Sequence, residues 1–138
     1  MTFEGQYLTY LEYKDLVEGE GGSAMAEMPF NLLEFECRKK IDNRTQNRLV
    51  DVEDIPQEVK ICEFKMINIM SKANEKIETI NDNAVKSENI DGYSVTYATQ
   101  DEVKEILTIQ EQEINNIMED MLMNVVVNGV HIIYLGVE

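Results

Sequence analysis

Residues 56–83 read PQEVKICEFKMINIMSKANEKIETINDN. Pro56 suits the first helical position, where its missing amide costs nothing, and Glu58 favours the positive end of the helix dipole. Apolar residues then recur every three or four positions, which predicts one long amphipathic helix ending near residues 81–83: Val59, Cys62, Met66, Met70, Ala73, Ile77 and Ile80. A second apolar side is formed by Ile61, Phe64, Ile67 and Ile69. Such a helix is typically central in its bundle or packed against a neighbouring subunit.

Three further helices are expected around this one. Thr9-Tyr-Leu-Glu12 forms a capping box, and the short helix that it opens is ended by the glycine-rich stretch 18–23. A second helix is predicted from about Phe30 to Leu49, with a buried stripe of Phe30, Leu33, Cys37 and Ile41. Thr99-Gln-Asp-Glu102 is another capping box and opens the last helix. The apolar face of this helix consists of Val103, Ile106 or Leu107, Ile114, Ile117, Met118, Met121 and Leu122.

Two segments depart from the helical pattern. Tyr93, Val95 and Tyr97 alternate with polar residues after the turn signal Asp91-Gly92, which predicts a short strand that needs a backbone partner. Asn128-Gly129 fits either the C-terminal cap of the last helix or a type I′ hairpin turn; the cap is favoured because the flanking residues do not alternate cleanly. The apolar tail from Val130 either packs on its own bundle or docks against another protein.

These patterns predict one mainly α domain over residues 1–138. It is a small bundle of about four helices with a strand-like segment near residues 93–97 and an extended apolar C-terminal docking segment, residues 130–138. No apolar run approaches the roughly 20 residues that span a bilayer, and residues 1–6 do not resemble a signal peptide. The expected location is therefore the cytoplasm, or an assembly formed there.

The net charge of −15 argues against binding to DNA by neutralisation of phosphates. The charge is uneven, because eight acidic residues and one basic residue, Lys104, follow Gln100. Cys37 and Cys62 are expected to be buried thiols, and the single histidine, His131, lacks a second metal ligand nearby in the sequence. No nucleophile, acid–base pair, phosphate cradle or calcium loop is recognisable. We therefore expect no catalytic, cofactor or metal site and no enzymatic activity.

The order of several segments resembles the head–tail connector (adaptor) family of long-tailed phages. The opening Tyr7-Leu-Thr9 with Glu12-Tyr13 resembles that family's Y-L-T-x-x-E-Y. Further similar segments are Phe35, Arg38, Ile41-Asp42 and Thr45; Ile55-Pro56-x-x-Val59-Lys60; Ser87-Glu88-x-x-Asp91-Gly-Tyr-Ser-Val-Thr-Tyr97; and Tyr134-Leu-Gly-Val137. Together they span nearly the whole chain. The chain departs from the family in a longer, glycine-rich loop over residues 18–28 and in a longer, more acidic second half of the last helix.

The resemblance implies a virion structural protein of the phage neck, assembled in the host cytoplasm. Its subunits would form a ring beneath the portal protein, twelve-fold when assembled, and isolated subunits could stay monomeric until the portal templates them. The ring would extend the DNA channel without binding DNA specifically and would offer a surface to the next head-closure or neck protein. No membrane contact and no cofactor are implied.

Two groups of residues are candidates for these roles. The apolar and strand-like residues are the candidate subunit or portal interface: Asp91, Gly92, Tyr93, Val95, Tyr97, Ile132, Ile133, Tyr134, Leu135 and Val137. The acidic residues of the last helix are the candidate channel wall, since carboxylates repel a passing phosphate backbone: Glu111, Glu113, Glu119 and Asp120. Two alternative functions remain, another neck component (a head-closure or tail-completion protein) and a small acidic DNA-mimic inhibitor.

Overall fold

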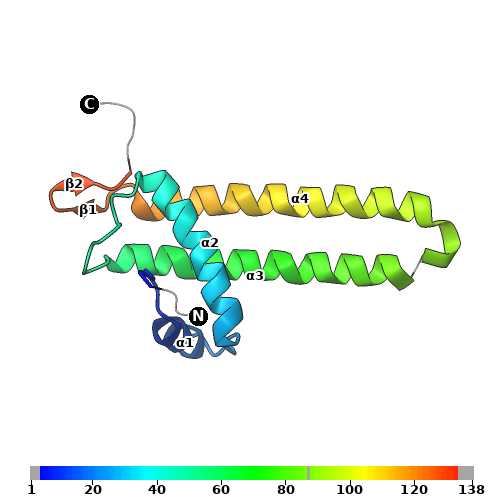
Figure 1. Ribbon diagram of the computed structural model, residues 1–138, viewed down its shortest axis with the longest axis horizontal. Helices are drawn as coiled ribbons and strands as arrows, with labels where there is room; N and C mark the ends of the chain where they lie inside the picture. Colours follow the sequence, from blue (N-terminus) through cyan, green and yellow to red (C-terminus); the bar gives the residue numbers. More distant parts are fainter. Residues whose placement is uncertain (1–3, 87, 134–138) are drawn as a thin grey trace. The chain divides into compact units, whose positions relative to one another are not determined.

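The computed structural model describes the backbone of residues 4–86 and 88–133, and the side chains of residues 4–82 and 100–133. Its helices are α1 (Tyr10–Gly19), α2 (Glu27–Thr45), α3 (Gln57–Lys86) and α4 (Glu88–Leu122) (Figure 1). Two short strands follow, β1 (Val126–Val127) and β2 (Val130–His131). The prediction of a mainly helical protein with about four helices is confirmed. None of the helices in the described ranges combines the length and the apolar character of a bilayer-spanning segment.

The helix starts follow the local signals in the sequence. The Thr9 hydroxyl accepts a hydrogen bond from the Glu12 amide at 3.2 Å, and the Glu12 carboxylate accepts one from the Thr9 amide at 3.0 Å, so the predicted capping box is present. Helix α3 begins directly after Pro56, as expected. Helix α2 lies a few residues earlier than predicted and ends at Thr45, and its cap residue Gln46 adopts a left-handed conformation with φ 53°.

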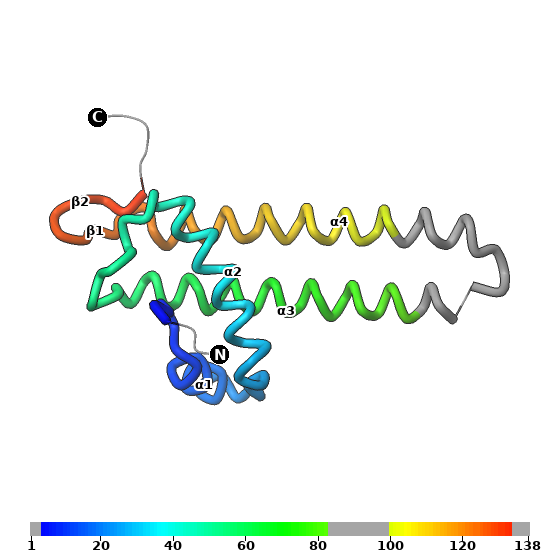
Figure 2. The backbone as a smooth tube through the Cα atoms, viewed as in Figure 1, coloured from blue at the N-terminus to red at the C-terminus, as the bar shows by residue number. Residues whose placement is uncertain are grey.

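The chain divides into two compact units, and helices α3 and α4 each contribute to both. Unit 1 comprises residues 1–67 and 117–138, and unit 2 comprises residues 68–116. Figure 2 traces the backbone through the elements of each unit.

Among the described side chains, unit 1 contains most of the buried apolar ones. An aromatic cluster joins three of its helices: the Tyr13 ring on α1 stacks on Phe30 of α2, with centroids 4.7 Å apart, and lies 5.9 Å from the ring of Phe64 on α3. The stripe predicted for the second helix is buried at Phe30, Cys37 and Ile41. Met118 and Leu122 from the end of α4, and Val125, Ile132 and Ile133 beyond it, complete this core. The core therefore draws on both ends of the chain.

Residues 126–131 form an antiparallel hairpin, in which Val127 pairs with Val130. Asn128 and Gly129 have φ values of 53° and 80°, the consecutive left-handed conformations of a type I′ turn. The favoured interpretation of Asn128-Gly129 as the cap of the last helix was wrong, because α4 already ends at Leu122. The hairpin alternative is confirmed, since a two-residue turn needs little alternation in its flanks.

The predicted strand near residues 93–97 was also wrong. The structure includes Tyr93–Tyr97 in α4, which begins at Glu88 and not at the capping box of Thr99. A helix satisfies its backbone groups internally, whereas a lone strand requires a partner segment. Alternation at only three positions was too short a signal to exclude a helix.

Candidate functional site: two grooves of the α3–α4 hairpin

Unit 2 consists of antiparallel stretches of α3 and α4 that lie side by side (Figure 1). Of its described side chains, only Met70, Ala73 and Ile114 are buried apolar residues. Leu107 and Ile109 are 44% and 47% exposed. The remaining apolar residues are half-buried: Ile69, Ile77, Ile80, Val103 and Ile106. Two helices alone cannot cover the apolar residues of both, and these side chains remain accessible along their seam.

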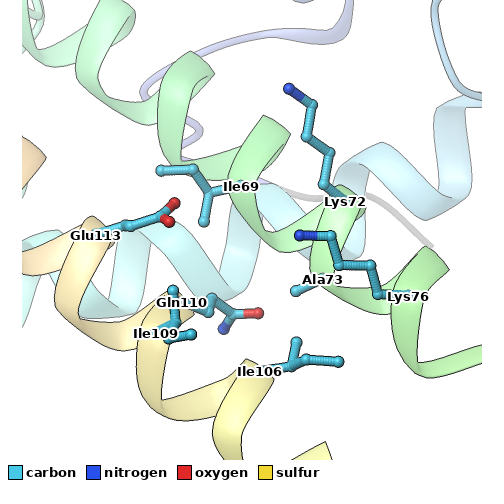
Figure 3. Close-up of a pocket in the computed structure, with 8 residues that line it drawn as sticks. All are labelled: Ile69, Lys72, Ala73, Lys76, Ile106, Ile109, Gln110 and Glu113. Atoms are coloured by element: carbon cyan, nitrogen blue, oxygen red, sulfur yellow. The ribbon is translucent and has the colours of Figure 1, made fainter. Parts of the chain in front are cut away.

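On one side of the seam, two adjoining hollows of about 170 and 520 Å³ share Lys72, Lys76 and Ile106. We call them together groove A. Figure 3 shows the side chains from α3 and α4 around the smaller hollow, with the Glu113 carboxylate reaching toward Ile69. The full lining of groove A is Ile69, Lys72, Ala73, Glu75, Lys76, Thr79, Ile80, Ile106, Ile109, Gln110 and Glu113.

A hollow of about 490 Å³, here groove B, is lined by a different set of residues from the same two helices. These are Ile77, Asn81, Gln100, Val103, Lys104, Leu107, Thr108 and Glu111. On α3, positions 77 and 81 are rotated from positions 76 and 80 by about 100° around the helix axis. Grooves A and B therefore flank the seam on opposite sides of the hairpin.

The four acidic channel candidates are exposed, but they do not form one face. Glu113 lines groove A and Glu111 lines groove B. In unit 1, Glu119 accepts a hydrogen bond from Arg44 at 3.1 Å, and Asp120 is exposed. Residues two positions apart on a helix point about 160° away from each other, so Glu111 and Glu113 cannot face the same channel.

The candidate interface residues are placed only in part. Ile132 and Ile133 are 0% and 2% exposed and belong to the core of unit 1, so this part of the tail packs on its own chain. Asp91, Gly92, Tyr93, Val95 and Tyr97 fall within α4, and their side chains lie outside the described residues. Tyr134, Leu135 and Val137 also lie outside the described residues. Beside the buried isoleucines, Val126 and Val130 of the hairpin are about half exposed.

Sequence reasoning missed a buried carboxyl pair in unit 1, Glu34 on α2 and Glu63 on α3. The Glu34 carboxylate accepts a hydrogen bond from the amide of Tyr7, and the Glu63 carboxyl accepts one from the amide of Leu8, both at 3.2 Å. A signal was present, because each glutamate occupies a position in an apolar stripe of three- and four-residue spacing: Phe30-Glu34-Cys37-Ile41 and Val59-Glu63-Met66-Met70.

The surroundings of the pair favour the protonated form of Glu63. Burial raises the pKa of Glu63 well above its ordinary value, and the adjacent Glu34 carboxylate and a hydrogen bond donated to it by protonated Glu63 raise it further. Burial also raises the pKa of Glu34, against the opposing effects of the hydrogen bond from Glu63 and of Arg38, whose guanidinium lies 3.4 Å from it. Two adjacent buried carboxylates repel each other, so the pKa of one of them rises and its protonated form is favoured.

The surroundings of the pair assign it a structural role. Burial and the hydrogen bond to Asp42 raise the pKa of the Tyr7 phenol, and Arg38 donates a hydrogen bond to the carbonyl oxygen of Glu4 at 2.6 Å. A hollow of about 430 Å³ is bordered by Tyr7, Arg38 and Asp42 but not by either glutamate. Within the described residues, no group of three metal-ligating side chains forms a metal site. The pair therefore fastens the N-terminal segment to helices α2 and α3.

Comparison of the chain with protein families, with curated proteins and with solved structures finds no match.

Proposed function

We propose that the chain is a head–tail connector subunit of a long-tailed phage, which assembles as a ring beneath the portal protein. The observation that carries the proposal is the ordered series of segments that resemble this family. The most specific are Ser87-Glu88-x-x-Asp91-Gly-Tyr-Ser-Val-Thr-Tyr97 and Tyr134-Leu-Gly-Val137. The ring would extend the DNA channel and present a surface to the next neck protein.

The geometry of unit 2 supports a role in an assembly. Its α3–α4 hairpin has an apolar groove on each side and few buried apolar residues of its own among those described. A subunit surrounded by copies of itself needs apolar surface beyond its own core, and two such sides allow one neighbour on each. A catalyst would instead need convergent reactive groups at one concave site.

The charge of the chain supports a channel wall to which only some of the α4 carboxylates contribute. A net charge of −15 favours a wall along which DNA slides without being held. Because a helix presents only one side to a channel, the carboxylates of α4 cannot all take part. Asp120 is the best candidate of the four, since Glu111 and Glu113 line the grooves and Glu119 is engaged by Arg44.

The test is co-purification of the chain with the portal protein encoded in the same genome, followed by negative-stain electron microscopy. We expect an additional ring of density beneath the portal, and a portal from an unrelated phage serves as the control. If the folded helical chain does not bind its own portal, the connector assignment fails. Another neck position or an acidic DNA mimic would then be the better assignment, and salt-sensitive capture by a basic protein would identify the mimic.

A further inference from the structure

The hairpin of unit 2 leaves several of its apolar side chains partly uncovered. Leu107 and Ile109 are each more than two fifths exposed, on opposite sides of α4. Half-buried isoleucines accompany them on both sides, Ile77 in groove B and Ile80 in groove A. Exposed apolar residues grouped along a groove, in contrast to scattered ones, mark a site where another protein packs.

The grooves differ from the rest of the chain in charge. Groove A is lined by two lysines, Lys72 and Lys76, and two glutamates, Glu75 and Glu113, so its formal charge is zero. Groove B is lined by Lys104 and Glu111 and is also neutral. The whole chain carries −15.

Charge balance identifies the occupant. Two copies with a net charge of −15 each repel one another over most of their surfaces, and contact costs least where the local charge is zero. A basic partner would gain most from the acidic surface and little from a neutral groove. The grooves therefore fit a second copy of this chain, because each offers one or more lysines to the glutamates of the other.

We propose that groove A of one copy packs against groove B of the next copy. Two different faces on opposite sides of the hairpin give a head-to-tail contact that can repeat, whereas a two-fold dimer through groove A would leave groove B uncovered. The contact deepens the proposed function and rests on it for closure into a ring. The apolar residues of the two grooves supply the packing, and the charged pairs fix the register.

A matched pair of threonines tests the contact. Thr79 lines groove A and Thr108 lines groove B, both are exposed, and each hydroxyl donates a hydrogen bond to the carbonyl oxygen four residues earlier. Thr79→Cys and Thr108→Cys are made singly and together, and treated with a short bis-maleimide cross-linker. Gln112, exposed and in neither groove lining, provides the control variant Gln112→Cys. The native thiols Cys37 and Cys62 are buried and remain in place.

We expect the mixture of the two single variants to give a cross-linked dimer and the double variant to give a ladder of multimers. Neither single variant alone, nor Gln112→Cys mixed with either, should cross-link to a comparable extent. Cross-linking of Thr79→Cys alone as efficient as that of the mixture would overturn the head-to-tail contact in favour of a two-fold one. The absence of mixed cross-links, both in the concentrated free chain and with the portal protein present, would overturn the contact altogether.

This experiment is independent of the portal test. Portal binding without mixed cross-links would leave the connector function standing and remove the groove contact. A cross-linked ladder without portal binding would support the groove contact and remove the connector function. Added salt provides a second measurement: self-association through neutral grooves should strengthen as the repulsion between acidic copies is screened, whereas binding of a basic protein should weaken. Self-association that weakens with salt would contradict the proposal.

Discussion

Glu34 on α2 and Glu63 on α3 accept hydrogen bonds from two consecutive backbone amides. The Tyr7 amide donates to Glu34, and the Leu8 amide donates to Glu63. Both carboxyls are fully buried. The two amide hydrogen bonds need no proton on the carboxyls, but ionisation of both carboxyls would place two like charges side by side in the core. The stability of this attachment therefore depends on the protonation of the pair.

This dependence predicts that stability falls as pH rises. The pKa of Glu63 is raised in the folded chain, so its contribution is complete below the ordinary value of 4.5 and is lost as pH rises toward the folded pKa. Glu63→Gln can still donate a hydrogen bond to Glu34 but cannot ionise. Compared with the wild type, its free energy of unfolding should decline less steeply above pH 4.5, by up to about 1.4 kcal/mol per pH unit.

Urea unfolding across a pH series measures this difference. Glu36→Gln removes the same charge from an exposed position of α2 and should keep the slope of the wild type. Parallel pH profiles for Glu63→Gln and the wild type would show that the buried proton makes no contribution.

The capping box of α1 predicts a second effect on stability. Thr9→Ala removes the hydroxyl that accepts a hydrogen bond from the Glu12 amide, and it should lower the free energy of unfolding by about 1 kcal/mol. Thr9→Ser retains a hydroxyl and should restore most of the loss. Denaturant unfolding of the three proteins at one pH provides the measurement, and equal losses for both variants would assign the effect to the threonine methyl group.

Val130 in the C-terminal hairpin and Ile132 just after it should respond very differently to truncation. Ile132 is fully buried in unit 1, and Ile132→Ala should cost about 2–5 kcal/mol. Val130 is 52% exposed, and Val130→Ala should change stability by less than about 0.5 kcal/mol. Thermal unfolding followed by circular dichroism compares them. Equal, small effects would mean that the segment does not pack on its own chain in solution.

Two glycines offer a matched test of backbone conformation. Gly129 has φ 80° in the type I′ turn, so Gly129→Ala should cost about 1–2 kcal/mol even though no atom lies within 4 Å of the added methyl group. Gly19 is equally unobstructed but lies at the end of α1 with no positive φ, and Gly19→Ala should cost nothing. The comparison by denaturant unfolding separates strain from crowding. A stable Gly129→Ala variant would contradict the assigned turn.

The sequence predicted the fold best where a local signal and a periodic pattern agreed. The Thr9 capping box and the stripe from Val59 to Ile80 identify α1 and α3, because both depend on residues within one or two helical turns. The prediction of a strand from Tyr93 to Tyr97 was wrong because the alternation was short and because aromatic and β-branched residues favour strands only weakly. The prediction of a helix cap at Asn128-Gly129 was wrong because the same two residues suit a helix cap and a hairpin turn equally well.

The candidate site was predictable only in outline. The excess of apolar residues on the third helix allowed either a central position in the bundle or contact with a neighbouring subunit. Phe64 and Ile67 are buried in unit 1, and the grooves lie on the later part of that helix. Helix geometry alone predicts that the α4 carboxylates lie on different sides of the helix. A count of charges along the sequence does not show this separation. Glu34 and Glu63 were missed because glutamate is rarely buried unless partnered, and the partner of each lies on another helix.

The separation between Leu8 and Glu63 also sets an order of events during translation. Glu63 leaves the ribosome 55 residues after Leu8, a delay of about 3–11 s at roughly 5–20 residues per second. For that interval the amide of Leu8 has no native acceptor, and the N-terminal segment cannot take its final place. The first residues made therefore wait for α3, and the core of unit 1 is complete only later, when the residues from Met118 to Ile133 have also been made.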